Sequence, residues 1–314
     1  MINWGINALN HGSSLAVFKD GKLHTWANCK EDLLNSSIIT EALHQGAPDR
    51  IFWYERPWIK KARQIYAGQF NTALDMSTLP KRHLTQFKYA KVSYTPHHGS
   101  HAAAGYYTSP FNHCAIVVLD AIGEFECATI WEGLHGEMKK VWSRSYPHSL
   151  GLFYSAYTQY VGLTPIRDEY IFQQMAAQGN SYLFLNSVRK HFNEGVLNLK
   201  TNFHCGLYWE DNQLMTLQEQ CDLAAAVQQV FEEQVALIMQ KAKDLTGSDC
   251  LVYMGGCAMN SKTNKEVVEP MFKYRWSLPN PGDPSSSIGA VLYHTKQREW
   301  KWQWDPVKHI EINV

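Results

Sequence analysis

A strand pattern that occurs twice is the feature of this sequence that most restricts its fold. Residues 5–28 and 115–144 each contain three runs of alternating apolar residues separated by short turns. In both copies a tight turn with glycine joins the last two runs, at Asp20-Gly21 and at His135-Gly136. Such runs and turns are typical of antiparallel hairpins. We therefore predict two similar three-stranded units, in two halves packed face to face.

Helical patterns occupy the sequence between and after the two strand units. We expect helices over 97–108, 149–163, 216–245 and 283–296. The third begins with Thr216 and Glu219, which are spaced as a capping box, and it stops before Gly247. A strand is expected over 250–254. Strands and helices in this order predict an α/β fold with two lobes.

The composition indicates a folded chain without a general attraction to charged partners. Of the 314 residues, 45% are hydrophobic and 18% are charged, and the formal net charge is zero. The apolar runs are far shorter than the roughly 18–20 residues of a membrane helix. The first residues lack a signal-peptide pattern, and the seven cysteines form no CxxC pair. We therefore expect a cytoplasmic protein with no membrane association.

The segment HHGSH contains the strongest candidates for a metal site. His97 and His101 are four residues apart, so they share one face of the expected helix and can bind one ion. Asp120, at the end of an apolar strand, and Asp283, after the segment PNPG, are candidates for the third and fourth ligands. Such a set suits Fe(II), Mn(II) or Zn(II). The alternative is that the histidines only cap and decorate the start of the helix.

Two glycine-containing segments offer further candidates. Gly255 and Gly256 follow a strand and precede Asn260, an arrangement that lets the backbone approach a nucleotide closely. Paired glycines after a strand also occur in ordinary tight turns. His11, in the first turn of the first strand unit, is either a general base near neutral pH or a solvent-exposed turn histidine.

The segment 50–91 combines positive charge with aromatic residues. It contains nine lysines and arginines, two acidic residues and eight aromatic residues. Nucleic-acid-binding surfaces use this mixture, because cations contact phosphates and rings stack on bases. The interpretation that we favour from the sequence is a solvated basic face over an aromatic core.

Several motifs, taken in order, resemble the N-terminal, actin-like-fold domain of the O-carbamoyltransferases of nodulation-factor and antibiotic biosynthesis. That domain is also similar to the transferase that forms threonylcarbamoyladenosine on tRNA. The motifs span nearly the whole chain: NHGSS with KDGKL, YERPWIKKAR, HHGSHAAAGYY, VVLDAIGEFECATIW, HSLGLFYSAYTQYVGL, MGGCAMNS and NPGDPSSSIGAVL. The resemblance implies a duplicated actin-like, or ribonuclease H-like, fold. We expect one lobe over 1–110 and a second over 111–314, with a helical insertion at about 150–247.

The resemblance also implies functional roles and cofactors. The positions are, for the metal, His97, His101, Asp120 and Asp283; for the base, His11; and for the nucleotide, Gly123, Gly255, Gly256 and Asn260. In the family the carbamoyl group is carried by carbamoyl adenylate, which forms from carbamoyl phosphate and ATP. The expected cofactors are therefore ATP, carbamoyl phosphate as donor, and a divalent metal, with Fe(II) preferred over Mn(II) or Zn(II).

The chain departs from the family in ways that concern its partners and acceptor. Full-length relatives carry a second domain that makes the adenylate, so either a partner supplies it in trans or this chain performs both steps. The segment DEYIFQQMAAQG has Ile171 where lysine is usual and Gln174 in place of glycine. The short form resembles bacteriophage proteins, which implies a host-cytoplasmic enzyme that modifies hydroxymethyl-pyrimidines such as hydroxymethylcytosine, in DNA or as nucleotides.

Other functions remain open at this point. A sugar or antibiotic hydroxyl ranks slightly behind the hydroxymethyl-pyrimidine as acceptor. An actin-like ATPase or sugar kinase would use the same fold without the histidine pair. A nucleotide-binding regulatory subunit of a carbamoylating complex would need no catalysis at all.

Overall fold

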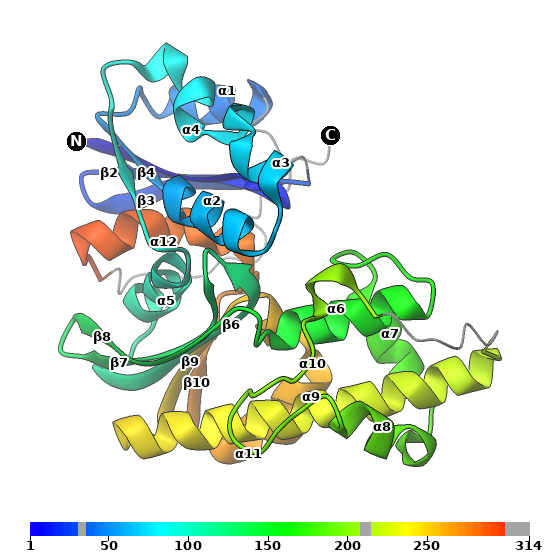
Figure 1. Cartoon of the computed structure of the whole chain (residues 1–314). Coiled ribbons are helices and arrows are strands. Elements are labelled where there is room, and N and C mark those ends of the chain that lie inside the picture. Colours follow the sequence, from blue (N-terminus) through cyan, green and yellow to red (C-terminus); the bar gives the residue numbers. More distant parts are fainter. Residues whose placement is uncertain (31–35, 208–214, 299–314) are drawn as a thin grey trace.

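The computed structural model describes residues 1–30, 36–207 and 215–298, and its described part contains two five-stranded sheets (Figure 1). The strand orders are β3-β2-β1-β4-β5 and β10-β9-β6-β7-β8. In each sheet an antiparallel three-stranded unit is extended by two parallel strands beside its first strand. The two halves therefore repeat one topology, which is the duplicated actin-like fold.

Both three-stranded units form where the sequence predicted them. The first sheet consists of β1 (Ile2–Asn10), β2 (Gly12–Lys19), β3 (Lys22–Cys29), β4 (Arg50–Trp53) and β5 (Lys91–Tyr94). The second consists of β6 (His113–Gly123), β7 (Glu126–Leu134), β8 (Glu137–Ser145), β9 (Cys250–Met254) and β10 (Tyr274–Trp276). The turn residues Asp20, Gly21, His135 and Gly136 all have positive φ, which is the conformation of tight hairpin turns that match strand twist.

Helices lie between the sheets and beyond them. Those of the first half are α1 (Ser36–His44), α2 (Pro57–Tyr66), α3 (Phe70–Leu74), α4 (Pro80–His83) and α5 (His97–Thr108). The others are α6 (Leu150–Tyr160), α7 (Glu169–Ala176), α8 (Leu185–Arg189), α9 (Leu217–Thr246), α10 (Ser261–Thr263), α11 (Glu269–Met271) and α12 (Asp283–Thr295). The capping box at Thr216 and the left-handed Gly247 bound α9, as predicted. Within the described ranges, every helix is too short or too polar to span a bilayer.

Strand β6 packs against a hydrophobic core on each of its faces. Ala115, Val117 and Leu119 belong to the core formed with α6 and α9, whereas Cys114, Ile116 and Val118 belong to the core formed with α5 and α12. Successive residues of a strand point to opposite faces, so a strand buried on both sides reads as one continuous apolar run. Burying each valine, isoleucine or leucine contributes about 1.5–3 kcal/mol. This strand therefore holds Asp120 on a rigid support.

Helix α12 connects the last part of the chain to the first sheet. A Cβ at Gly289 would lie 1.7 Å from the carbonyl oxygen of Ser100, and a Cβ at Gly5 would lie 1.8 Å from that of Ser287. Only glycine permits this close packing of α12 on α5 and β1. The N-terminus of α12 is consequently held beside that of α5 (Figure 1). Because α12 packs on the first sheet, a lobe boundary at residue 110 divides the sheets but not all the helices, and the lobe limits stay a prediction.

Candidate functional site

Four side chains from three separate elements meet between the two sheets. His97 and His101 lie on the first turns of α5, Asp120 lies on β6, and Asp283 is the first residue of α12. One ligand atom of each residue lies within 4.8 Å of those of the other three. The structure thus brings together the four residues that the sequence predicted as metal ligands.

The distances within this cluster fit a shared ion. His97 Nε2 lies 2.9 Å from Asp120 Oδ2, 3.2 Å from His101 Nε2 and 3.4 Å from Asp283 Oδ1. His101 Nε2 lies 3.2 Å from Asp283 Oδ1 and 3.6 Å from Asp120 Oδ2. An ion bound at about 2.0–2.2 Å holds its ligand atoms roughly 3.0–3.5 Å apart. Both histidines direct Nε2 toward the cluster, so both can bind the same ion.

The charges of the cluster call for a cation. Both histidines are buried, and burial disfavours every charged form. Burial lowers the pKa of His97, but hydrogen bonds to Asp120 and Asp283 outweigh it and raise this pKa well above its ordinary value. Burial likewise raises the pKa of Asp283, but His101 and His97 hold it well below its ordinary range. The two carboxylates therefore favour positive charge within the cluster, which a divalent cation fits.

The strand that carries Asp120 is longer than the sequence indicated. The expected strand end at Asp120 is wrong, because β6 continues to Gly123, although its pairing with β7 is irregular between Leu119 and Gly123. A Cβ at Gly123 would lie 2.3 Å from Cδ2 of His97. Gly123 therefore leaves room for His97, and its role in nucleotide binding stays a prediction.

Two asparagines of β1 fix the position of Asp283, and the sequence analysis did not identify them. Asn10 Nδ2 donates to Asp283 Oδ2 at 3.1 Å, and Asn7 Nδ2 donates to the Asp283 carbonyl oxygen at 3.0 Å. Asn7 is fully buried. The proximity of both residues to His11 in the sequence was the only available signal, since 273 residues separate Asn10 from Asp283.

An ion pair between the partly exposed Arg56 and the buried Glu124 lies at the start of α5, and it was also missed. The Glu124 carboxylate accepts hydrogen bonds from the backbone N–H and the guanidinium of Arg56, and it lies 3.4 Å from the backbone nitrogen of His97. The N-cap residue Pro96 offers no side-chain cap. A carboxylate at a helix N-terminus is favoured by the helix dipole. The pair between Arg56 and Glu124 therefore ties the start of α2 to the helix that carries the histidines.

His11 directly follows Asn10, the residue that contacts Asp283. Its exposed side chain is in the turn between β1 and β2, directly after Asn10. Because Asn10 contacts Asp283, this turn lies on the same side of the molecule as the candidate ligands. The role of His11 as a base stays a prediction.

The Gly-Gly loop lies against β6 next to the cluster. Gly255 has a φ of 94°, and a Cβ there would lie 2.2 Å from the Leu119 carbonyl oxygen, so only glycine suits this position. A Cβ at Gly256 would lie 3.2 Å from Asp120 Oδ1. The amide of Asn260 caps α10 and pairs with Gln228, which leaves its predicted contact with a nucleotide untested.

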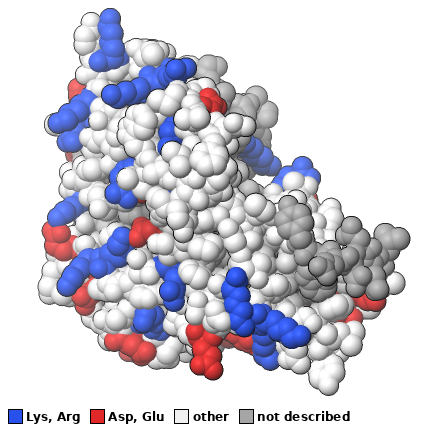
Figure 2. Space-filling model, viewed as in Figure 1, with Lys and Arg blue, Asp and Glu red and all other residues white. Residues whose placement is uncertain are grey.

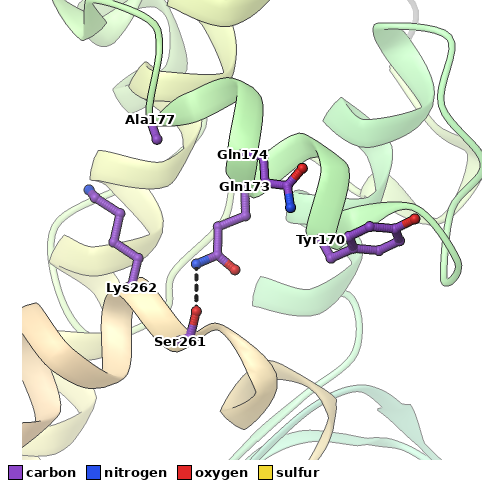
Figure 3. Close-up of a pocket in the computed structure, with 6 residues that line it drawn as sticks. All are labelled: Tyr170, Gln173, Gln174, Ala177, Ser261 and Lys262. Carbon is purple, nitrogen blue, oxygen red and sulfur yellow. Dashed lines mark hydrogen bonds between the residues drawn. The ribbon is translucent and has the colours of Figure 1, made fainter.

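A cavity of about 300 Å³ lies beside this loop, between α7 and α10. Figure 3 shows its lining residues: Tyr170, Gln173, Gln174, Ala177, Ser261 and Lys262. Gln173 Nε2 donates to Ser261 Oγ at 3.1 Å across one side. Gln174 occupies the position where glycine was expected from the family resemblance, and it lines the cavity. Sequence reasoning noted this residue but did not find the cavity.

The predicted basic face over an aromatic core is wrong for α2. Lys61 and Arg63 are buried, whereas Trp58 and Tyr66 are 59% and 70% exposed, and so is Phe70 on the following helix α3, at 59%. The two cations turn inward because they donate to backbone carbonyl groups inside the protein. The expectation holds elsewhere in the segment, since Phe52, Trp53 and Tyr54 are buried and Lys81, Arg82, Lys88 and Lys91 are exposed.

Comparisons with known proteins place these features in context. The family model for the carbamoyltransferase N-terminus matches residues 55–292. The uncharacterized protein sll1178 of Synechocystis sp. is 26% identical over an alignment 343 residues long, which covers 92% of this chain and 56% of that protein. The nodulation protein NolNO of Sinorhizobium fredii is 24% identical over 244 residues, which cover 73% of this chain and 33% of that protein. The chain thus spans between a third and somewhat over half of the length of these relatives.

A solved structure supports the fold alone. The Lmo2764 protein of Listeria monocytogenes, a candidate N-acetylmannosamine kinase, superposes with a TM-score of 0.50 at 8% identity. The match covers 94% of this chain and 99% of that one. At this identity the comparison indicates shared architecture and carries no information on the reaction.

Proposed function

The chain belongs to the carbamoyltransferase N-terminus family, and on this premise we propose that it is a metal-dependent O-carbamoyltransferase. In this proposal a carbamoyl group passes from carbamoyl adenylate, formed from carbamoyl phosphate and ATP, to an acceptor hydroxyl. The observation that carries the proposal is the convergence of His97, His101, Asp120 and Asp283 in a member of this family. A sugar kinase of the same fold has no need for a buried histidine pair.

The four clustered residues would hold a divalent cation, for which we propose Fe(II), with Mn(II) and Zn(II) as alternatives. When bound, such an ion supplies Lewis-acid polarisation of a carbonyl or phosphoryl oxygen. The protein supplies the orientation of the ligands. Asn10 holds one oxygen of Asp283, and the pair of Arg56 with Glu124 fixes the start of α5.

The adenosine part of the donor is proposed to bind at the Gly-Gly loop. Gly255 and Gly256 lie directly beside Asp120, so a nucleotide on this loop would present its phosphate side toward the cluster. The neighbouring cavity offers the amide of Gln173 and the hydroxyl of Ser261 as hydrogen-bonding groups. Its volume of about 300 Å³ lies at the lower end of small-molecule sites.

His11 is proposed to accept the proton of the acceptor hydroxyl as its oxygen attacks the carbamoyl carbon. The bond between this carbon and the phosphate oxygen breaks, and AMP leaves with the electron pair. An exposed turn that borders the cluster is accessible to an acceptor and to solvent, which can then remove the proton. Its link to Asp283 through Asn10 supports this position for the base.

For the acceptor we propose a hydroxymethyl-pyrimidine, in DNA or as a nucleotide, ahead of a sugar hydroxyl. The exposed residues Lys81, Arg82, Lys88 and Lys91 support contact with phosphate. The inward cations of α2 do not contribute to such a surface.

Mass spectrometry of hydroxymethylcytosine-containing DNA tests this function. The DNA is incubated with the protein, ATP, carbamoyl phosphate and Fe(II). A gain of about 43 mass units per modified base, the mass of one transferred carbamoyl group, would support the activity, the acceptor and adenylate formation by this chain. Conversion of ATP to AMP without a gain in the mass of the DNA would reject this acceptor, and sugar hydroxyls would be tested next. Neither change, even with an adenylate-forming partner present, would favour a regulatory subunit.

A further inference from the structure

Helix α2 presents its apolar side to solvent and its polar side to the protein. Trp58 is 59% exposed, Ile59 38%, Ile65 50% and Tyr66 70%, and Ala62 between them is exposed as well. These positions follow the spacing of a single helix face. The buried side of the helix contains Lys61, Arg63 and Gln64. This arrangement is the reverse of that expected for a helix on the surface of a monomer.

Hydrogen bonds on the polar side hold the helix in this orientation. Lys61 Nζ donates to the carbonyl oxygens of Ala73 at 3.0 Å and of Asp75 at 2.7 Å. Arg63 donates to the Glu124 carbonyl oxygen at 3.2 Å and to Gln69 Oε1 at 2.9 Å. Rotating α2 to bury its apolar side would leave these groups unpaired, which is costly. The exposure of the apolar side is therefore built into the fold.

The exposed apolar surface continues onto α3. Phe70 is 59% exposed, Leu74 is 72% exposed, and Met76 just beyond the helix is 38% exposed. We define the apolar stripe as Trp58, Ile59, Ile65, Tyr66, Phe70, Leu74 and Met76. In Figure 2 few charged side chains interrupt the surface over α2 and α3. Exposed apolar surfaces of this kind mark interaction sites.

We propose that the apolar stripe is the contact surface of a homodimer, in which it packs against the same stripe of a second copy of the chain. Aromatic residues with few charges are typical of the centre of protein interfaces and of their energetic hot spots. A twofold axis places the stripe of one copy against the same stripe of the other copy. Because the stripe contains no charged residues, this contact brings no like charges together.

The exposed area is of the size that a dimer requires. An aromatic side chain has an area of about 150–250 Å². Trp58, Tyr66 and Phe70 are 59–70% exposed, so together they offer roughly 350 Å² of surface to a partner. Leu74, Ile65, Ile59 and Met76 add to this area. The sum approaches the approximately 800 Å² per partner of a standard interface.

The stripe does not have the chemistry of a nucleic-acid surface, because the cations of α2 point away from it. The stripe also lies close to the candidate functional site. Arg56 directly precedes α2, and its pair with Glu124 reaches the start of α5, where His97 lies. A partner copy on α2 would thus pack beside the candidate metal cluster.

Sedimentation velocity of the 314-residue chain at concentrations from 1 to 100 μM tests the proposal. We expect a concentration-dependent species of twice the 36.0 kDa of one chain. Leu74→Glu should raise the dissociation constant at least about thirtyfold, the effect of losing an interface hot spot. The matched control is Leu183→Glu, which changes a leucine of similar exposure, 66% against 72%, on another surface. This control should dimerise as the wild type does.

Hydrogen exchange of the wild-type chain provides a second test without substitutions. Raising the concentration through the dimer range should protect amides of residues 57–78 more than those of 181–189. The proposal is overturned if the chain remains a monomer at 100 μM, whatever else it then binds. It is also overturned if Leu74→Glu leaves the dimer unchanged or if protection develops on a different surface.

Discussion

Asn10 donates a hydrogen bond from Nδ2 to Oδ2 of Asp283 at 3.1 Å, although 273 residues separate them in the chain. The other carboxylate oxygen of Asp283 lies 3.2 Å from Nε2 of His101. One oxygen is therefore occupied by β1 while the other faces the candidate ligands. This arrangement makes Asn10 a positioning residue for the cluster.

We predict that Asn10→Ala weakens metal binding by about 10–100-fold, as is usual when a partner of a ligand is removed. The carboxylate of Asp283 would gain rotational freedom while all four candidate ligands remain. Competition with a metal chelator measures the affinity. Asn71→Ala, an exposed asparagine on α3, is the control, and equal affinities of the two variants would contradict the role of Asn10.

For His11→Ala we predict turnover that is about 10²–10⁴-fold lower, because a positioned general base contributes that factor. The metal content should not change, since His11 is not among the four clustered residues. Rates of carbamoyl transfer and metal analysis of the same samples check both statements. His24→Ala, an exposed histidine on β3, should behave as the wild type. Normal turnover of His11→Ala would exclude it as the base.

Filling the cavity between α7 and α10 should weaken nucleotide binding. We predict that Gln174→Trp raises the KM for ATP at least tenfold, because the indole would occupy space where part of the nucleotide is proposed to lie. Metal affinity should stay the same. Gln178→Trp places the same side chain on an exposed residue outside the lining and serves as control. An unchanged KM for Gln174→Trp would place the nucleotide elsewhere.

The sequence predicted those parts of the molecule that depend on local patterns. Helix α5 and both strand units formed where periodicity and turn residues indicated, and the spacing of His97 and His101 placed them on one helix face. The contacts of Asn10 and Glu124 could not be predicted, because they connect segments that only the folded chain brings together. The solvated basic face over an aromatic core that was predicted for 50–91 is wrong over α2.

The error over α2 has a physical cause. Lysine and arginine are usually solvated, so a basic and aromatic helix suggests that its aromatic side is buried. Here the carbonyl groups of Ala73, Asp75 and Glu124 needed donors, and the long side chains of Lys61 and Arg63 reach them. Satisfying buried backbone groups outweighed the burial of the apolar side. A short segment does not reveal which carbonyl groups will lack partners.

The stability of the protein should fall in mildly acidic solution, because the partly buried His191 becomes protonated more readily in the unfolded chain. Burial lowers the pKa of His191, whose ring lies among Tyr157 and Phe203. A histidine with a folded-state pKa below the unfolded value of about 6.5 takes up its proton more readily when unfolded. The contribution of neutral His191 to the free energy of unfolding is thus complete above pH 6.5. It is lost as the pH falls from 6.5 through the folded-state pKa.

Urea unfolding of the wild type and of His191→Gln at pH 7.5 and pH 5.5 isolates this contribution. The difference in unfolding free energy between the two proteins should shrink at the lower pH, by at most about 1.4 kcal/mol for each unit of pKa difference. A difference that is the same at both pH values would contradict the prediction.

The central claim is that His97, His101, Asp120 and Asp283 together bind one divalent ion on which carbamoyl transfer depends. Metal analysis after anaerobic loading with Fe(II) and desalting tests it most directly, on the wild type, on His101→Ala and on His44→Ala as an exposed-histidine control. We predict about one equivalent of metal per chain in the wild type and the control, and almost none, together with lost activity, in a folded His101→Ala protein. A full equivalent of metal in His101→Ala, or none in the wild type, would contradict the account.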